Sequence, residues 1–346
     1  MAKITRVGVD LAKNVFHIHA VDENEKTVWQ GKYSRSNWIK AVVKRTPQTA
    51  TIGMEACGSA HHWARELIKL GYDVKLVAAQ FVKPYVKTNK NDKVDAEAIC
   101  ETINRPNMRF VSVKAVEQQD LQAMHRIREE LISQRTSKAN QIRGLTAEYG
   151  IFAPVGIHHL KKHIPVWLED AENSLTPLFR ELLQMMYDDL TLLGESIDSI
   201  TNKIRSSLNS NPAAQRLMEI TGVGPLVCSA LLIDLGDGSA FKKGRDFAAS
   251  LGLVPRQHST GGRDRLLGIS KRGNGYLRKL LAHGARAAFR HVKDKTDPLS
   301  LWIKKLSLTK HANVAIIALA NKIARISWAL VVKNEKYDDS LAAYKA

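Results

Sequence analysis

The chain has 346 residues, and its 52 Lys and Arg against 34 Asp and Glu give a formal net charge of +18 at pH 7. This length exceeds one ordinary hydrophobic core and predicts two or three domains, while the positive charge favours nucleic acid as the partner. The 3 cysteines are widely spaced, which excludes a disulfide framework and predicts a reducing, cytoplasmic location with no signal peptide and no membrane span.

The first predicted strand, residues 6–11, carries one carboxylate, Asp10, out of an otherwise apolar run. An isolated carboxylate in such a strand is costly unless it is paired or bound to a cation. Two further strands are predicted at 15–21 and 27–33, with a turn between them at 22–25. Asp10 therefore predicts a metal ion or a basic partner on an early, central strand.

Helices and strands alternate in the next segment. We predict a helix at 37–44, a strand at 51–55, a helix at 59–70 and a strand at 72–78. Ser59 is suited to the N-cap of the second helix and Gly71 to the position after its end. The order β-β-β-α-β-α-β predicts an α/β domain with a mixed sheet and helices packed against it.

Three more carboxylates suit the same site as Asp10. Glu55 ends the strand expected beside it, and Asp92 and Asp95 lie three residues apart at a helix start, on one face. Each acid alone is explained by a solvated strand end or a helix cap. Phosphodiester chemistry with two Mg²⁺ ions roughly 3.5–4 Å apart needs several carboxylates, so the four together favour a shared Mg²⁺ site.

Long helices are predicted in the middle of the chain. Apolar residues from Leu121 to Tyr149 recur at helical spacing, and a second helix is predicted at 177–208 after a proline-rich hinge. Its apolar stripe is close to a heptad repeat and predicts self-association, with packing inside one subunit as the alternative. The stripe consists of Leu182, Met186, Leu190, Leu193, Ile197, Ile200 and Ile204.

The last third begins with a glycine turn before the apolar helix predicted at 226–235. Gly222 and Gly224 resemble a helix-hairpin-helix turn, whose backbone N–H groups can contact a phosphate. An ordinary turn is the alternative. Core helices are predicted at 276–292 and 312–332, followed by a loose tail at 334–346.

A basic segment from Leu251 to Arg278 carries hydroxyl side chains among small residues. Its cations suit phosphodiester contact. They are Arg256, Arg263, Arg265, Lys271, Arg272 and Arg278. The segment therefore predicts a nucleic-acid contact, either with chemistry or as a binding loop alone.

Three motifs carry a resemblance to a known family. They are Val-Gly-Val-Asp10-Leu-Ala-Lys, Met-Glu55-Ala-Cys-Gly-Ser and Asn-Asp92-Lys-Val-Asp95-Ala. They resemble the DEDD tetrad of the RuvC-like, RNase H-like domain in insertion-sequence-110 transposases, and the second half of the chain resembles their 1111 subgroup. The resemblance implies a RuvC-like domain at 1–114, a coiled-coil helical region at 115–210 and a mostly helical transposase domain at 211–346.

The same resemblance implies a site-specific recombinase that cuts and rejoins donor and target DNA under the guidance of a structured RNA, the bridge RNA. It implies a dimer or tetramer in which the acids come from one subunit and a serine nucleophile from another. The hydroxyl before the Gly-Gly pair is the best match, so Ser259 ranks ahead of Thr260 and Ser270, which stay open.

Three other functions compete with a transposase. A RuvC-like junction nuclease would hydrolyse DNA with water and need no serine. A non-catalytic nucleic-acid-binding protein would show no metal-dependent cleavage. An actin-like sugar kinase shares the Val-Gly-Val-Asp-Leu-Ala pattern, but no further Gly-rich nucleotide loop is evident and a charge of +18 would be unusual for it.

Overall fold

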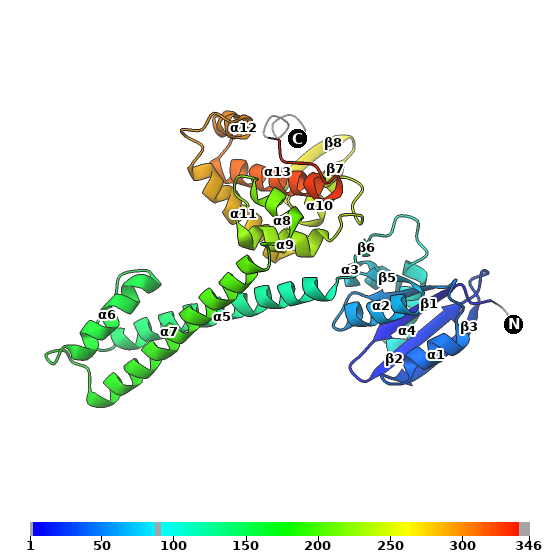
Figure 1. The fold of residues 1–346 in the computed structure, drawn as a ribbon, viewed down its shortest axis with the longest axis horizontal. Coiled ribbons are helices and arrows are strands. Elements are labelled where there is room, and N and C mark those ends of the chain that lie inside the picture. The colour runs from blue at the N-terminus through cyan, green and yellow to red at the C-terminus, as the bar shows by residue number, and fades with distance from the viewer. Residues whose placement is uncertain (1–2, 87–90, 339–346) are drawn as a thin grey trace. The chain divides into compact units, whose positions relative to one another are not determined.

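The computed structural model describes residues 3–86 and 91–338, which form two compact units, Met1–Ala115 and Val116–Ala346 (Figure 1). The second unit contains both the long helices and the C-terminal helices. The division of that part into two domains stays a prediction. Within the tail expected at 334–346, residues 339–346 lie outside the described residues.

The first unit contains a mixed sheet of 6 strands in the order β3-β2-β1-β4-β5-β6. The strands are β1 (Arg6–Leu11), β2 (Val15–Val21), β3 (Thr27–Ser34), β4 (Thr51–Glu55), β5 (Asp73–Val77) and β6 (Phe110–Val111). β1, β2 and β3 pair antiparallel, β4 and β5 continue parallel to β1, and β6 pairs antiparallel with β5. The predicted mixed sheet is confirmed, with the short edge strand β6 as an addition.

Helices cover both faces of this sheet (Figure 1). The helices are α1 (Trp38–Arg45), α2 (Ala60–Lys69), α3 (Ala79–Val82) and α4 (Asp92–Thr102), and a 3₁₀ turn, η1 (Lys83–Tyr85), follows α3. Val7 and Val9 of β1 are buried in one cluster with Trp38 of α1 and Leu67 of α2. Because side chains alternate along a strand, Gly8 and Asp10 face the opposite side, where α4 packs.

The residues predicted at the two ends of α2 are confirmed in position, but the predicted side-chain cap by Ser59 is wrong. Gly71 follows the helix with a φ of +87°, as expected for a glycine after a helix end. Ser59 does occupy the N-cap position, but its backbone is left-handed and its side chain makes no capping hydrogen bond. A Ser at that position needs extended backbone for its oxygen to reach the helix amides, so α2 begins without a side-chain cap.

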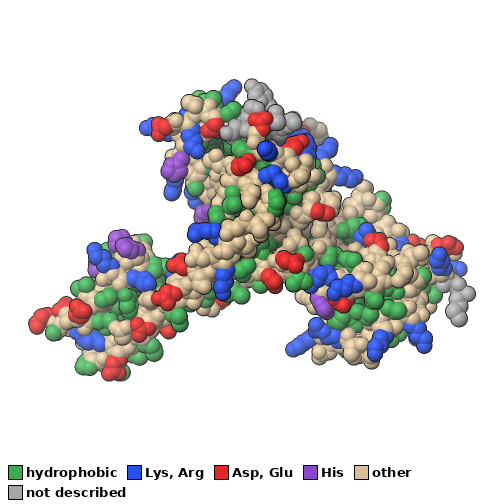
Figure 2. All heavy atoms as spheres, in the orientation of Figure 1, with side chains coloured by type: hydrophobic (Ala, Val, Ile, Leu, Met, Phe, Trp, Pro, Cys, Tyr) green, Lys and Arg blue, Asp and Glu red, His purple; other side chains and the backbone are tan. Residues whose placement is uncertain are grey.

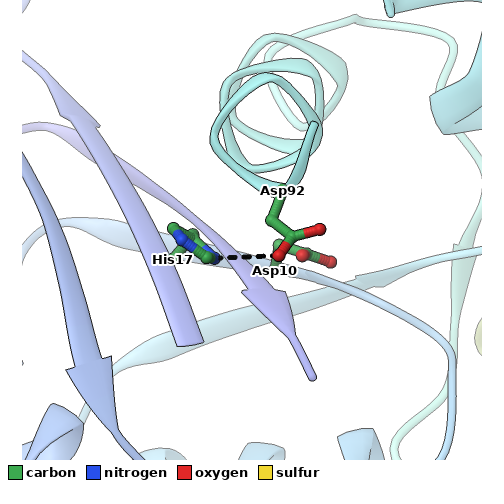
Figure 3. Close-up of side chains that lie close together, drawn as sticks. All are labelled: Asp10, His17 and Asp92. Carbon is green, nitrogen blue, oxygen red and sulfur yellow. Dashed lines mark ion pairs between the residues drawn. The ribbon is translucent and has the colours of Figure 1, made fainter. Parts of the chain in front are cut away.

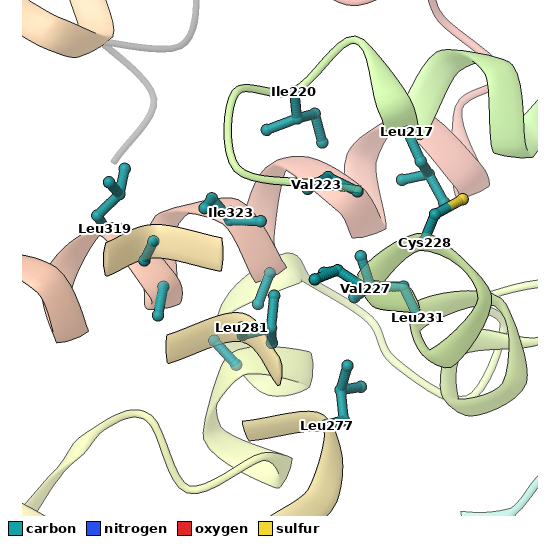
Figure 4. Packing of buried hydrophobic residues seen from close by; sticks show 14 of the residues in the cluster. Leu217, Ile220, Val223, Val227, Cys228, Leu231, Leu277, Leu281, Leu319 and Ile323 are labelled. Atoms are coloured by element: carbon teal, nitrogen blue, oxygen red, sulfur yellow. The ribbon is translucent and has the colours of Figure 1, made fainter. Parts of the chain in front are cut away.

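The second unit is built from helices. They are α5 (Val116–Ala147), α6 (Ile157–Glu169), α7 (Pro177–Ser206), α8 (Pro212–Met218), α9 (Pro225–Leu235), α10 (Gly244–Ser250), α11 (Gly275–Arg290), α12 (Pro298–Ser307) and α13 (Ala312–Val332), with a hairpin of β7 (Pro255–Thr260) and β8 (Arg263–Ile269). Figure 4 shows Leu217, Leu231, Leu281 and Ile323 of α8, α9, α11 and α13 meeting in one core. This core holds the C-terminal helices together.

Four of the seven residues of the α7 stripe are buried within the chain, which favours the alternative of packing inside one subunit for them, and self-association stays a prediction. Met186 and Leu190 are buried against α5 and α6 in one cluster, and Ile197 and Ile204 are also buried within the chain. Side chains that already pack inside one subunit are not available to a second one. The large apolar side chains that α7 does expose are Leu178, Leu182, Met185 and Leu192.

The helix α13 is long and apolar enough to cross a membrane by length and composition. It packs instead as a core helix, with Leu319 and Ile323 buried in the C-terminal core. Its Lys322 is 3% exposed and lies over the Trp302 ring at 4.3 Å, and burial lowers the pKa of that ammonium to about 8. The prediction of a buried helix at 312–332 is confirmed.

A buried histidine connects α5 with α9 and α11. His125 Nδ1 lies 2.7 Å from Tyr276 Oη, its Nε2 lies 2.8 Å from Ser229 Oγ, and Ser229 Oγ donates to the Pro225 carbonyl at 2.7 Å. Because the Ser229 hydrogen is used by Pro225, Nε2 donates and Nδ1 accepts from the tyrosine. The imidazole is therefore neutral and fully satisfied, and burial lowers its pKa to about 4.

This histidine predicts a pH dependence of stability. Below pH 6.5 the unfolded chain binds a proton at His125 that the native state binds only near pH 4, so stability falls as the pH falls through this window. Relative to a His125→Gln variant, wild type is expected to lose on the order of 2 kcal/mol of unfolding free energy between pH 7 and pH 5. Urea unfolding of both proteins at each pH measures this difference, and parallel pH profiles would contradict it.

Candidate active site

Two glycines let α4 lie directly on the strands that carry the first two acids. Gly8 of β1 and Gly53 of β4 are cross-strand neighbours. A Cβ on Gly8 would overlap the Ala96 carbonyl oxygen and lie 2.5 Å from the Cys100 amide nitrogen, and one on Gly53 would lie 2.5 Å from Ile103 Cγ2. Asp10 and Glu55 each follow one of these glycines by two residues and so lie on the same face of the sheet.

This packing predicts that Gly8→Ala is strongly damaging. The new methyl group meets helix backbone, which cannot move without lifting α4 and its acids away from β1. We expect a loss of about 1–3 kcal/mol of stability, together with a weaker affinity for divalent cations. Gly58→Ala, where no atom lies within 4 Å of the new Cβ, is the matched control. Thermal melting and Mn²⁺ titration of both variants make the comparison, and equal behaviour would contradict the proposed role.

The structure brings Asp10 and Asp92 together with a histidine, His17 (Figure 3). One ligand atom from each of the three lies within 4.8 Å of the other two. Asp10 and His17 are directly opposite on β1 and β2, and His17 Nδ1 lies 3.6 Å from Asp92 Oδ2. Asp92 occupies the first turn of α4, where the helix dipole favours a negative charge.

Asp92 is not the cap of its helix. The cap is Asn91, whose side chain accepts a hydrogen bond from the Lys93 amide at 3.1 Å. The Asp92 carboxylate is therefore left to face the sheet, where Figure 3 shows it beside Asp10. Asp95 lies three residues further along α4, also within its first turn.

Glu55 and Asp95 are the two predicted acids that are not part of the three-residue group among the described residues. The Glu55 and Asp10 carboxylates nevertheless both influence one side chain, that of Cys57. Burial raises the pKa of the half-buried Cys57 thiol, and the Glu55 and Asp10 carboxylates raise it further. A thiol influenced by both acids indicates a negative potential between the ends of β1 and β4. Whether all four acids share one metal site stays a prediction.

The donor set of this group fits a divalent cation. Asp10 and Asp92 supply hard oxygen ligands of the kind that Mg²⁺ and Mn²⁺ prefer. His17 supplies a buried ring nitrogen, Nδ1, that has no hydrogen-bond partner among the described residues. Two carboxylates and a ring nitrogen that converge from β1, β2 and α4 therefore could hold a divalent cation.

Sequence reasoning missed His17. The sequence could not place it, because counting outward from the three-residue connection between β1 and β2 pairs Asp10 with Phe16, whereas the structure pairs Leu11 with Phe16 and so Asp10 with His17. A histidine opposite a strand carboxylate then lies on the same face of the sheet. Only the register distinguishes His17 from His19, which pairs with Gly8.

The best-ranked hydroxyl, Ser259, lies on the exposed hairpin of β7 and β8. Its cross-strand partner is Asp264, and Ser259 Oγ donates to Asp264 Oδ1 at 2.6 Å. Gln257 Nε2 donates to both, at 2.8 and 2.9 Å. The hydrogen bond from Ser259, followed by that from Gln257, lowers the pKa of the Asp264 carboxyl, so this acceptor is ionised at neutral pH.

The segment expected to be a loop is therefore a β-hairpin with a two-residue Gly-Gly turn and a register shift near Pro255. Gly261 and Gly262 have φ values of +57° and +76°, as a type I′ turn requires. Residues alternate between the two faces of a strand, so Thr260 shares a face with the arginines while Ser259 shares one with Asp264. The arginines of that face are Arg263 and Arg265, and Arg256 is exposed at the register shift of β7. Ser270 lies just beyond β8, where its amide donates to the Val254 carbonyl.

The remaining predicted contacts divide into exposed and structural residues. Lys271 and Arg272 are exposed. Arg278 is partly buried and donates to the carbonyl oxygens of Leu251 and Arg272. These hydrogen bonds give Arg278 a structural role. Figure 2 shows Lys and Arg side chains spread over the visible face of both units, with acidic side chains among them.

The two glycines of the predicted phosphate turn also differ. A Cβ on Gly222 would lie 2.8 Å from the Gly284 carbonyl oxygen of α11, so its glycine is needed for helix packing. Gly224 begins α9 with no atom within 4 Å of a built Cβ. Gly224 is therefore the one of the two with open space for a phosphate.

Comparisons with known proteins agree on one family. A model of the IS110 DEDD transposases matches residues 7–151, and the model described as "Transposase IS116/IS110/IS902 family" matches residues 214–298. The chain is 45% identical to a probable family 20 transposase of Pseudomonas aeruginosa, over 96% of this chain and 98% of that protein. It is 43% identical to the transposase for insertion sequence element IS1111A of Coxiella burnetii, over 97% and 92%, and 40% identical to that for IS1328 of Yersinia enterocolitica, over 96% and 98%.

Proposed function

The chain belongs to the IS110 family of transposases, and from that premise we propose that it cuts and rejoins DNA with a serine nucleophile and a divalent-metal site, guided by a structured RNA. As a member it is a DNA transposase, an enzyme of DNA recombination. The observation that carries the finer proposal is the convergence of Asp10 and Asp92 from β1 and α4.

We assign the metal to Asp10, Glu55, Asp92 and Asp95. When bound, Mg²⁺ would polarise the scissile phosphate and neutralise charge that develops on its oxygens. The chain's own contribution is to hold these acids on one rigid face. Gly8 and Gly53 set the height of α4 above the sheet, and the first turn of α4 carries Asp92, which lies beside Asp10, and Asp95.

We assign the nucleophile to Ser259. A serine hydroxyl attacks poorly at neutral pH unless a base or metal activates it. The Asp264 carboxylate accepts the hydroxyl hydrogen at 2.6 Å and so fixes the direction of the oxygen lone pairs. His258 lies on the opposite face of β7, which argues against it as the base. Attack of Ser259 Oγ on a DNA phosphate would form a phosphoserine bond and release a DNA hydroxyl. One phosphodiester bond would replace another, without hydrolysis by water.

We further propose that the protein acts in the cytoplasm as a dimer or tetramer, on donor and target DNA, together with its guide RNA. The net charge of +18 supports contact with polyanions. Because Met186, Leu190, Ile197 and Ile204 of the α7 stripe are buried within the chain, an oligomer would use other residues.

Sequencing of the RNA that co-purifies with the protein tests the guided function. We expect a discrete RNA species encoded beside the gene, retained after washing at a salt concentration that removes bulk RNA. A matched preparation of an unrelated protein of similar charge is the control for non-specific RNA. Heterogeneous cellular RNA in both preparations would favour a junction nuclease instead.

A further inference from the structure

His17 is fixed beside the proposed metal site by the sheet itself. Directly opposed residues of an antiparallel pair have Cβ atoms about 4.5–5.5 Å apart on one face of the sheet. Asp10 and His17 are such a pair. In Figure 3 the His17 ring lies beside Asp10 and faces Asp92, with its nitrogen toward the carboxylate.

The distance between His17 and Asp92 is too long for a direct charge-assisted bond. Such bonds are about 2.7–2.9 Å long, whereas Nδ1 and Oδ2 are 3.6 Å apart. Nδ1 is buried and has no hydrogen-bond partner among the described residues. A buried donor or acceptor without a partner is costly, so this nitrogen calls for a ligand.

The next inward-facing histidine on the same strand behaves differently. His19 receives a hydrogen bond on Nδ1 from Gln30 Nε2 at 2.9 Å. Burial lowers its pKa, with the Glu97 carboxylate acting in the opposite direction. The two histidines on one face of β2 therefore differ in hydrogen bonding: His19 Nδ1 has Gln30 as its partner, whereas His17 Nδ1 has none among the described residues.

The spacing of the group suits a single ion. Ligand atoms about 2.1 Å from an octahedral ion lie roughly 3.0 Å apart when adjacent and about 4.2 Å apart when opposite. The ligand atoms of Asp10, His17 and Asp92 all lie within 4.8 Å of one another, so a small inward adjustment places all three around one ion.

We propose that His17 Nδ1 is a direct ligand of the divalent cation, which makes the site a mixed nitrogen and oxygen site. This inference depends on the metal site proposed above. Nitrogen ligands strengthen binding of first-row transition ions relative to Mg²⁺, which prefers oxygen alone. The site should therefore prefer Mn²⁺ over Mg²⁺ more strongly than four carboxylates would.

Mn²⁺ bound to the full-length protein tests this assignment without relying on activity. Three-pulse electron spin echo spectra of wild type are expected to show ¹⁴N modulation from a coordinated imidazole. His17→Gln should keep a bound Mn²⁺ but lose the modulation, with affinity for Mn²⁺ reduced by about tenfold or more and affinity for Mg²⁺ changed less. His19→Gln is the matched control and should keep both.

The outcomes separate this inference from the function on which it depends. If Mn²⁺ binding disappears in Asp10→Asn but wild type shows no ¹⁴N modulation, the metal site stands and His17 is not its ligand. Modulation that persists in His17→Gln also overturns the assignment. If Asp10→Asn leaves Mn²⁺ binding unchanged, the proposed metal site itself is wrong. Melting temperatures of the variants establish that each is folded.

Discussion

Replacing Ser259 with Ala is expected to eliminate the covalent protein–DNA adduct and to reduce strand cleavage on the order of 10³-fold or more, because it removes the oxygen to which we assign the phosphoserine bond. The adduct is measured on end-labelled DNA after denaturation, as a labelled band at the mass of the protein. DNA binding should persist, since the exposed cations that hold phosphates remain in place.

Two matched variants identify the hydroxyl. Thr260→Val removes the hydroxyl on the arginine face of the hairpin and keeps the side-chain shape, and Ser270→Ala removes the one beyond β8. Both are expected to retain the adduct. An adduct that survives Ser259→Ala and disappears in either of these variants would show that the nucleophile has been misassigned.

Asp264→Asn measures the role of the Ser259 partner. The amide keeps an oxygen near Ser259 Oγ but loses the charge that accepts its hydrogen. We expect slower formation of the same adduct, with unchanged DNA affinity. An unaltered rate would mean that the carboxylate only stabilises the hairpin.

Asp10→Asn is expected to abolish DNA cleavage while leaving nucleic-acid binding largely intact, because the acid holds the metal and the basic surface holds phosphates. Asp10→Ala, Glu55→Ala and Asp95→Ala should behave alike. Asp73→Asn, at an exposed strand residue of the same sheet, is the matched control and should cleave normally. Cleavage by wild type in the presence of a chelator would contradict a metal-dependent mechanism.

A mixture of the two inactive proteins tests whether the acids and the serine act from different copies of the chain. Asp10→Asn and Ser259→Ala each lack one half of the proposed chemistry. If one copy supplies the acids and another the serine, the mixture should recover part of the cleavage activity. Neither protein should cleave DNA when it is assayed alone. If the mixture stays inactive at concentrations where the copies associate, the acids and the serine act from the same chain.

Local sequence determined most of the elements and the positions of the acids. Alternation of apolar residues and turn residues predicted β1 to β5 and their helices, and long helical periodicity predicted α5 and α7. The acids could be located because Asp10 and Glu55 end apolar strands and Asp92 begins a helix, positions where a charge stands out against its neighbours. These signals lie within a few residues of each other in the chain.

Tertiary structure decided which residues meet, and local patterns do not contain that information. His17 joins Asp10 because of the β1–β2 register, and Asp264 joins Ser259 because two glycines close a tight turn. The α7 stripe showed that the helix has an apolar face, but only the packing of α5 and α6 decided that Met186 and Leu190 are covered within the chain. Periodicity specifies a face of an element, whereas the partner of that face depends on contacts between residues distant in sequence.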